Sequence, residues 1–224
     1  MKSRRPIETM PRTGMTPAEI RIKATDITLA RMRRHGFDKV RLSDVAKDLG
    51  VSHAALYTHF VDKSALLDAV SERWLAETDV SLERICLSNK DPREKIQDWF
   101  MKLYQVKRDR VRCDPELYRA FDIAAARKKP FVIAHLATAN RQLVGLVKEA
   151  ADTLGREAPQ RKATLLFEAM SAFHHPKLMA DHFEEDRGPL LKHILDAVLT
   201  GMGAGRESPS AAAGRNKRSV ARRA

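Results

Sequence analysis

The stretch from Gly36 to Leu67 reads GFDKVRLSDVAKDLGVSHAALYTHFVDKSALL, and it decides how the N-terminal third of the chain folds. Apolar residues at i, i+1 and i+4 predict a short helix over 44–49 with one face in a core. Gly50 follows, and glycine there can adopt the positive φ that closes a helix. Ser52 is then placed to cap a second helix. Two short helices joined by a tight turn predict a helix-turn-helix.

The second helix of this pair is predicted from His53 to Phe60. Leu56 and Phe60 are spaced i, i+4 and should be buried on one face. In a helix-turn-helix the N-terminal part of the second helix enters the DNA major groove, where His, Tyr and Thr side chains can form hydrogen bonds with base edges. The residues left on the open side and N-terminal end are His53, Ala54, Ala55, Tyr57, Thr58 and His59.

The pattern resembles the TetR/AcrR family of bacterial transcriptional regulators. The family signature is present as Gly36-Phe37, Val45-Ala46, Leu49-Gly50-Val51-Ser52, Tyr57-Thr58-His59-Phe60 and Lys63, within about the first third of the chain. The resemblance implies that Tyr57 and His59 contact DNA phosphates or base edges and that Lys63 reaches the DNA backbone. The predicted DNA-binding residues are therefore Ser52, His53, Ala54, Ala55, Tyr57, Thr58, His59 and Lys63.

The sequence departs from the family pattern before the first helix of the pair. The family usually has a capping Thr where this chain has Arg41, so Ser43 is expected to cap that helix instead. An earlier helix is well marked, because Thr16-Pro17-Ala18-Glu19 is a capping box with proline at the first helical position. This helix should run to about His35 and end at Gly36.

Length and charge suggest two folded domains flanked by basic tails. The chain has 224 residues and a formal net charge of +12. Residues 1–14 carry +3 and residues 204–224 carry +5, and the C-terminal tail has no periodic apolar face. We predict a basic disordered arm over 1–15, a DNA-binding domain over 16–62, a helical effector-binding and dimerisation domain over 63–203, and a basic disordered tail over 204–224. Either tail could attract DNA phosphates or serve only solubility.

The remaining composition excludes several classes of protein. The chain contains no apolar run long enough to span a membrane and no signal peptide, and its two cysteines, Cys86 and Cys113, fit a reducing compartment. A cytoplasmic protein with no membrane partner is expected. No phosphate-binding glycine loop, nucleophile elbow or HExxH motif is present, so neither an enzyme nor a cofactor is expected.

Every long segment after residue 63 has helical periodicity, which predicts an all-α second domain. A long helix over 63–87 should join the two domains. Aspartate-proline and proline signals predict further helices from residues 92, 115 and 130, then one from 159 to about 175 and one from 189 to about 202. The resemblance implies that the last two form the dimer as a four-helix interface; alternatively, they complete the monomer core. Their apolar faces are Leu165, Leu166, Ala169 and Phe173, and Leu191, Ile194, Leu195, Val198 and Leu199.

A small-molecule effector is expected among the middle helices. His135 and His174 are the more informative candidates, because a buried imidazole needs a polar partner and a ligand can supply one. The candidate lining residues are Trp99, Leu103, Tyr104, Phe121, Phe131, His135, Phe167, Met170, Phe173 and His174. His174, His175, Asp181 and His182 could supply metal ligands, but Pro176 indicates a helix end there, so no metal is expected.

The function predicted from the sequence is a homodimeric DNA-binding transcriptional regulator, a repressor that a small-molecule effector releases from a palindromic operator. One alternative is a DNA-binding regulator controlled by a protein partner or by no effector. A remote alternative is an all-α enzyme. The sequence itself specifies neither the operator nor the effector.

Overall fold

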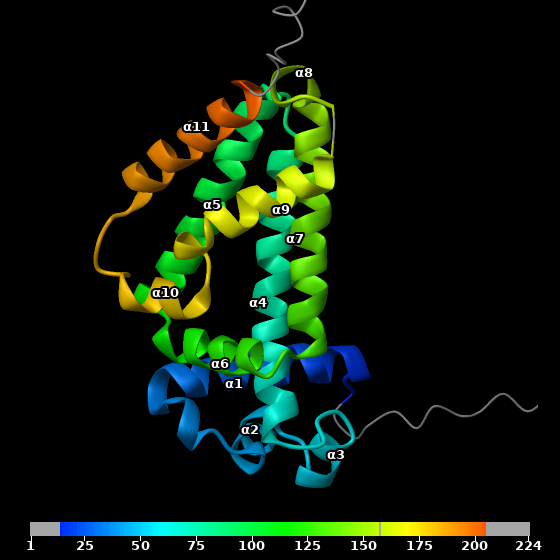
Figure 1. The fold of residues 1–224 in the computed structure, drawn as a ribbon. Helices are drawn as coiled ribbons and strands as arrows, with labels where there is room; N and C mark the ends of the chain where they lie inside the picture. Colours follow the sequence, from blue (N-terminus) through cyan, green and yellow to red (C-terminus); the bar gives the residue numbers. More distant parts are fainter. Residues whose placement is uncertain (1–13, 157, 205–224) are drawn as a thin grey trace, which may run out of the picture.

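The computed structural model describes residues 14–156 and 158–204, and all regular structure within them is helical. The prediction of an all-α fold is confirmed. Figure 1 shows a small helical unit, residues 14–62, at one end and a larger helical unit, residues 63–204, above it. The larger unit is called the second unit from here on. The helices are α1 (Pro17–His35), η1 (Phe37–Lys39), α2 (Leu42–Leu49), α3 (His53–Tyr57), α4 (Lys63–Cys86), α5 (Pro92–Cys113), α6 (Pro115–Ala126), α7 (Pro130–Glu149), α8 (Ala151–Leu154), α9 (Pro159–Ala169), η2 (Ser171–Phe173), α10 (Pro176–Asp181) and α11 (Gly188–Ala204).

Helix α1 begins and ends where the sequence predicts. The Thr16 hydroxyl accepts a hydrogen bond from the Glu19 amide, and the Glu19 carboxylate accepts one from the Thr16 amide. This reciprocal pair satisfies two amides that a helix N-terminus leaves without partners. Gly36 ends the helix with a φ of 85°, which glycine adopts without a steric penalty.

Helix α2 begins two residues earlier than predicted. Arg41 holds the N-cap position in an extended conformation and provides no side-chain cap, so the prediction that Ser43 caps this helix is wrong. Leu42 is buried, and its burial favours an earlier helix start. At the other end Gly50 has φ 75° and ψ 26°, the left-handed conformation expected of the residue that closes the helix.

Helix α3 is shorter than predicted and ends at Tyr57 instead of Phe60. The Thr58 hydroxyl donates a hydrogen bond to the Ala55 carbonyl at 2.7 Å, a side-chain contact that competes with helical continuation. Leu56 and Phe60 are nevertheless both buried, as the sequence predicts.

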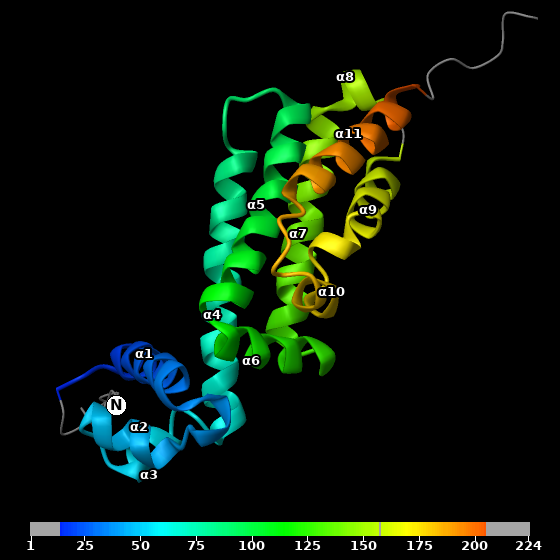
Figure 2. The same ribbon diagram turned by 90° about the vertical axis from the view of Figure 1, so that its left-hand side faces the viewer.

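Helix α4 connects the two units, as predicted, and extends from beside α2 and α3 into the second unit (Figure 2). It packs on α1 of the small unit and on α5, α6 and α7 of the second unit. The predicted helix starts at Pro92, Pro115, Pro130 and Pro159 are all confirmed. None of the described helices is both long enough and apolar enough to cross a membrane.

The predicted helix over 159–175 is interrupted. Helix α9 ends at Ala169, η2 follows, and a separate helix α10 begins at Pro176. His175 is extended, because the ring of a following proline disfavours the helical conformation of the residue before it. The N-terminal arm through residue 13 and the C-terminal tail from residue 205 lie outside the described residues.

Candidate nucleic-acid interface

Helix α3 presents an exposed polar face at the end of the molecule farthest from α8 and α11 (Figure 2). His53, Ala54 and Thr58 are exposed, and Tyr57 is 44% exposed. Ala55 is less accessible, because it is half-buried. The rings of His53 and Tyr57 meet edge to face with their centroids 4.6 Å apart. Two aromatic groups able to donate and accept hydrogen bonds therefore lie side by side on one helical turn.

Three contacts fix the orientation of this face. The Ser52 hydroxyl accepts a hydrogen bond from the Ala55 amide at 3.1 Å, which caps the helix. Leu56 is fully buried beneath it. Arg21 of α1 donates to the His59 carbonyl at 2.7 Å, and its guanidinium lies 4.8 Å from the centre of the Phe60 ring. Arg21 was missed by sequence reasoning, because no local pattern links it to residues 38 positions away.

His59 and Lys63, like Ala55, are less exposed than the other predicted DNA-binding residues. His59 is half-buried. The Lys63 ammonium donates to the Asp38 carbonyl at 2.7 Å and lies 5.5 Å from the centre of the Phe37 ring. An ammonium has three donors, so this bond leaves two for a further acceptor.

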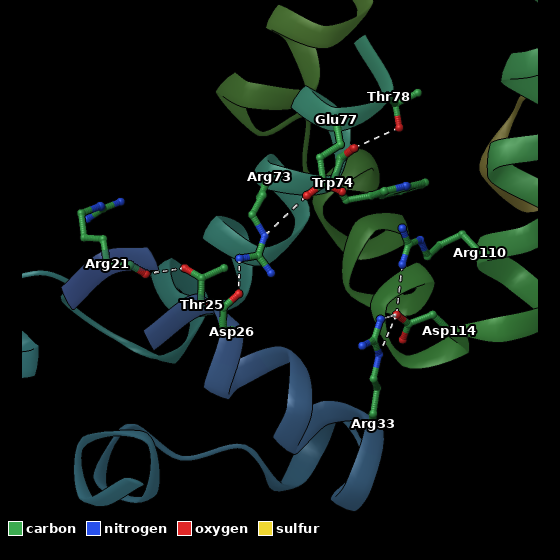
Figure 3. Close-up of polar contacts among 10 residues, drawn as sticks. All are labelled: Arg21, Thr25, Asp26, Arg33, Arg73, Trp74, Glu77, Thr78, Arg110 and Asp114. Atoms are coloured by element: carbon green, nitrogen blue, oxygen red, sulfur yellow. Dashed lines mark hydrogen bonds and ion pairs between the residues drawn. The ribbon is translucent and has the colours of Figure 1, made fainter. Parts of the chain in front are cut away.

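The small unit is joined to the second unit by an ion-pair cluster (Figure 3). Asp114, at the N-terminus of α6, is 3% exposed and accepts from Arg33 of α1 at 2.5 Å and from Arg110 of α5 at 3.1 Å. The Arg110 guanidinium also lies 5.5 Å from the centre of the Trp74 ring. Charged groups from both units therefore converge on one buried carboxylate. From the sequence alone, Asp114 is predicted only to begin a helix.

Other contacts reinforce the same junction. The Phe37 amide donates to the Glu116 carboxylate, and Arg119 pairs with Asp38 at 2.8 Å. Arg73 of α4 forms an ion pair with Asp26 of α1 at 2.5 Å, which Figure 3 also shows. Helices α1 and η1 are thereby tied to α4 and α6.

Most candidate effector residues lie inside the packed core of the second unit. Phe131 and Phe167 are half-buried, and the other eight are buried: Trp99, Leu103, Tyr104, Phe121, His135, Met170, Phe173 and His174. The rings of Tyr104 and Phe173 meet at 6.2 Å, and those of Phe167 and His174 at 4.1 Å. The rings of each pair therefore meet in the structure. The side chains themselves fill the space between the helices.

Both candidate histidines have protein partners. His135 Nδ1 lies 2.6 Å from the Asp79 carboxylate. His174 Nε2 lies 2.8 Å from the Phe167 carbonyl, and the Lys107 ammonium donates to the His174 carbonyl at 2.6 Å. Burial, with a smaller contribution from the charge of Lys107, lowers the pKa of His174 to about 3. Burial also lowers the pKa of Lys107 to about 8.

The second unit has a crevice of about 410 Å³ between α5 and the start of α11, hereafter the α5–α11 crevice. Its walls include the apolar side chain of Met101, the ring of Tyr104, and four charged side chains: Arg108, Asp109, Asp186 and Lys192. Of the ten candidate effector residues only Tyr104 lines it; Phe167 lines a smaller hollow of about 150 Å³ between α7 and α9. Sequence periodicity identified the core of this unit but missed the basic side chains at its surface crevice.

Neither cysteine nor metal chemistry is indicated within the described ranges. Cys86 is half-buried and Cys113 exposed, and both are free thiols. Burial raises the pKa of the Cys86 thiol to about 11, which disfavours the reactive thiolate. Residues 14–156 and 158–204 contain no cluster of three His, Cys, Asp or Glu side chains suited to hold a metal ion.

Two family models match the sequence. The model for bacterial regulatory proteins of the tetR family matches residues 26–70, which include the helix-turn-helix. The model for the tetracyclin repressor-like C-terminal domain matches residues 92–194, which form most of the second unit. No protein of curated function matches the sequence significantly.

Solved structures share the fold at low sequence identity. A putative transcriptional regulator from Pseudomonas aeruginosa is 18% identical, with a TM-score of 0.65 over 86% of this chain and 94% of that one. FadR from Bacillus subtilis, solved with stearoyl-CoA, is 15% identical, with a TM-score of 0.57 over 80% and 98%. FadR from Thermus thermophilus, solved with lauroyl-CoA, is 17% identical, with a TM-score of 0.58 over 85% and 98%.

Proposed function

The chain belongs to the TetR family of bacterial transcriptional regulators, and from that premise we propose that it is a homodimeric repressor which a small-molecule effector releases from a palindromic operator. The observation that carries the proposal is the exposed face of α3, where His53 and Tyr57 are held by a capped, tightly packed helix-turn-helix. Residues 16–62 are the proposed DNA-binding domain, and 63–203 the proposed effector and dimerisation domain.

The DNA contacts proposed for individual residues follow from the exposure and the hydrogen-bonding capacity of their side chains. His53 lies in the first turn of α3, the part that approaches base edges in this motif, and the small side chain of Ala54 permits close approach. Tyr57 and Thr58 are exposed farther along and can reach bases or phosphates. Lys63 retains donors for a backbone phosphate.

Dimerisation is proposed because one short reading helix contacts few base pairs, whereas two related by a two-fold axis can read half-sites about 34–36 Å apart. Parts of α9 and α11 remain available for this interface. Leu165 is 55% exposed and Leu190 45% exposed, and Ile194 and Val198 are half-buried. The remaining leucines of the predicted faces complete the core of the monomer: Leu166, Leu191, Leu195 and Leu199.

The α5–α11 crevice is the proposed entry point for the effector. Its volume of about 410 Å³ falls within the range of small-molecule sites, which is about 300–1,000 Å³. The crevice has two basic and two acidic side chains, and Arg108 pairs with Asp186 at 3.7 Å, so an acidic group of the ligand would pair with Lys192, while Met101 and Tyr104 would contact its apolar part. The FadR proteins of similar fold were solved with acyl-CoA thioesters, which combine these two properties.

A route from this crevice to the DNA-binding unit is present in the contacts of α5. Arg108 lines the crevice, and Arg110, two residues later in the same helix, holds Asp114, which also binds Arg33 of α1. A ligand that favours one position of α5 would thereby favour one position of α1. Such differential binding to two states is what couples effector affinity to DNA affinity.

Regulation without a small-molecule effector is the second candidate. It is favoured by the packing of the second unit, where eight of the ten candidate effector residues are buried against other side chains. The crevice distinguishes the two candidates: ligand binding there supports the first, and a crevice that stays empty in all effector screens supports the second.

The test is DNA binding by variants of the exposed face, measured by fluorescence anisotropy on an operator selected in vitro. Tyr57→Ala should weaken binding by about tenfold, and His53→Ala should change the preference at particular base pairs, at about 1–3 kcal/mol for each base-pair contact. Lys63→Ala should weaken binding to all sequences. His182→Ala is the matched control, because His182 is exposed and directly follows α10, which lies away from α3 (Figure 1). Unchanged binding in all three variants would contradict the proposal.

A further inference from the structure

A second hollow lies at the junction of the two units, away from the α5–α11 crevice. This junction pocket has a volume of about 230 Å³. Its lining includes Phe37 of η1, Lys63 of α4, Ile123 of α6 and Arg127, which directly follows α6. Leu67 of α4 adds a buried apolar surface. The pocket is therefore built by both units, so anything bound in it contacts both.

The charged side chains of the junction pocket are mostly basic. Lys63, Arg127 and Lys129 line it together with a single acid, Asp68. Lys129 pairs with Asp68 at 2.7 Å, which leaves two cations in excess. Lys63 has one bond, to a backbone carbonyl, and the guanidinium of Arg127 has no hydrogen bond or ion pair within the part of the chain that the structure describes. Unused donors beside an apolar surface fit an anion with an apolar part.

The turn between α6 and α7 positions two of these cations. Lys128 has a φ of 50°, which is strained for a residue with a side chain. The turn is held by backbone hydrogen bonds from Lys128 to Ala125 and from Lys129 to Ala124. The result is that Arg127 and Lys129 both line the pocket, whereas Lys128 between them does not.

We propose that the junction pocket binds a small organic anion, a carboxylate or phosphate monoester carrying an aromatic or branched apolar group. The anionic group pairs with Arg127 and Lys63, and the apolar group packs against Phe37 and Ile123. The pocket is smaller than the range of about 300–1,000 Å³ typical of sites for drug-sized ligands. Its occupant is therefore compact, in contrast to the ligand proposed for the α5–α11 crevice.

Occupation of this pocket bridges η1 and α4 to the end of α6. It therefore stabilises one position of the DNA-binding unit, and by linkage DNA and the anion alter each other's affinity by the same factor. This consequence for DNA rests on the proposed function, whereas the binding of the anion does not.

The first experiment is calorimetric titration of the full-length protein, without DNA, with phenyl phosphate, benzoate and uncharged benzyl alcohol at fixed ionic strength. We expect saturable binding of one of the two anions, one per chain, and none of benzyl alcohol. Arg127→Gln should weaken the affinity by about tenfold, because a hydrogen bond to a charged group is lost. Arg84→Gln, at an exposed arginine near the far end of α4, should leave it unchanged.

A second variant tests the pocket independently of its charge. Ile123→Trp places a larger side chain at the wall of the pocket and should abolish anion binding, while thermal unfolding confirms that the variant is folded. Equal affinity in wild type, Arg127→Gln and Ile123→Trp would overturn the proposal, as would no saturable binding of either anion. If Arg127→Gln weakens DNA binding while neither anion binds, the acceptor is a DNA phosphate and the proposal is wrong.

Discussion

Arg33 of α1 and Asp114 at the start of α6 form an ion pair of 2.5 Å, although 81 positions separate them in the sequence. The carboxylate is 3% exposed, and Arg110 of α5 contacts the same oxygen at 3.1 Å. Three helices from two units therefore depend on one buried side chain. This arrangement suits a protein in which events in one unit must reach the other.

Asp114→Asn should destabilise the protein by roughly 1–3 kcal/mol, because a buried charged acceptor is lost and two guanidinium groups keep no matching charge. Denaturation in urea measures the change. Asp98→Asn is the control, since the Asp98 side chain is 41% exposed and its pair with Lys90 should contribute less than about 1 kcal/mol. Equal effects of the two substitutions would show that the junction does not depend on Asp114.

Gly50→Ala should destabilise the protein by about 1 kcal/mol, because φ is 75° at this position and alanine is strained there. A Cβ at Gly50 would meet no atom within 4 Å, so the cost arises from the backbone alone. Gly145, inside α7, has the same open space but a helical backbone, so Gly145→Ala should stabilise by roughly 0.5–1 kcal/mol. Thermal or urea unfolding should give opposite signs; a shared sign would refute the strain argument.

The stability of the fold should decrease with acidification through His174. Its pKa is about 3 in the folded chain, because of burial and then the charge of Lys107, and about 6.5 when unfolded. Between these values the unfolded chain binds more protons, so this residue's contribution should fall by roughly 2 kcal/mol from pH 7 to pH 5. His174→Gln lacks this titration. Urea unfolding at both pH values should show a smaller loss in the variant, and an equal loss would argue against a buried neutral imidazole.

Leu165→Glu should convert the proposed dimer to a monomer, because it places a charge at an apolar side chain that is 55% exposed on α9. Analytical ultracentrifugation measures the change in mass. Leu87→Glu, at a position that is 75% exposed just after α4, should keep the wild-type mass. A Leu165→Glu protein that remains dimeric would move the interface away from this face of α9.

Local signals explain the parts of the fold that the sequence predicts. The start of α1 follows from Thr16 and Glu19, and the turn after α2 from Gly50, because each depends on residues a few positions apart. The end of α3 was predicted wrongly, because the bond from Thr58 to Ala55 competes with helix formation and the burial pattern does not reveal it.

The contacts that join the units could not be predicted in this way. Asp114 and Arg33 come into contact only when the helices pack together, and no spacing in the sequence predicts this contact. The candidate effector residues show a second limit of prediction from the sequence. Helical periodicity places Trp99 and Phe121 inside the domain, but it cannot separate a side chain that fills a core from one that lines a pocket.

The most direct test of the central claim is selection of bound fragments from randomised duplex DNA by the purified full-length protein, at near-physiological salt with excess competitor DNA. We expect enrichment of a two-fold-symmetric site whose half-sites lose their base preference when His53 is replaced by alanine. A folded protein that enriches no sequence, or the same sequence with and without His53 and Tyr57, would contradict specific DNA reading by the exposed face of α3.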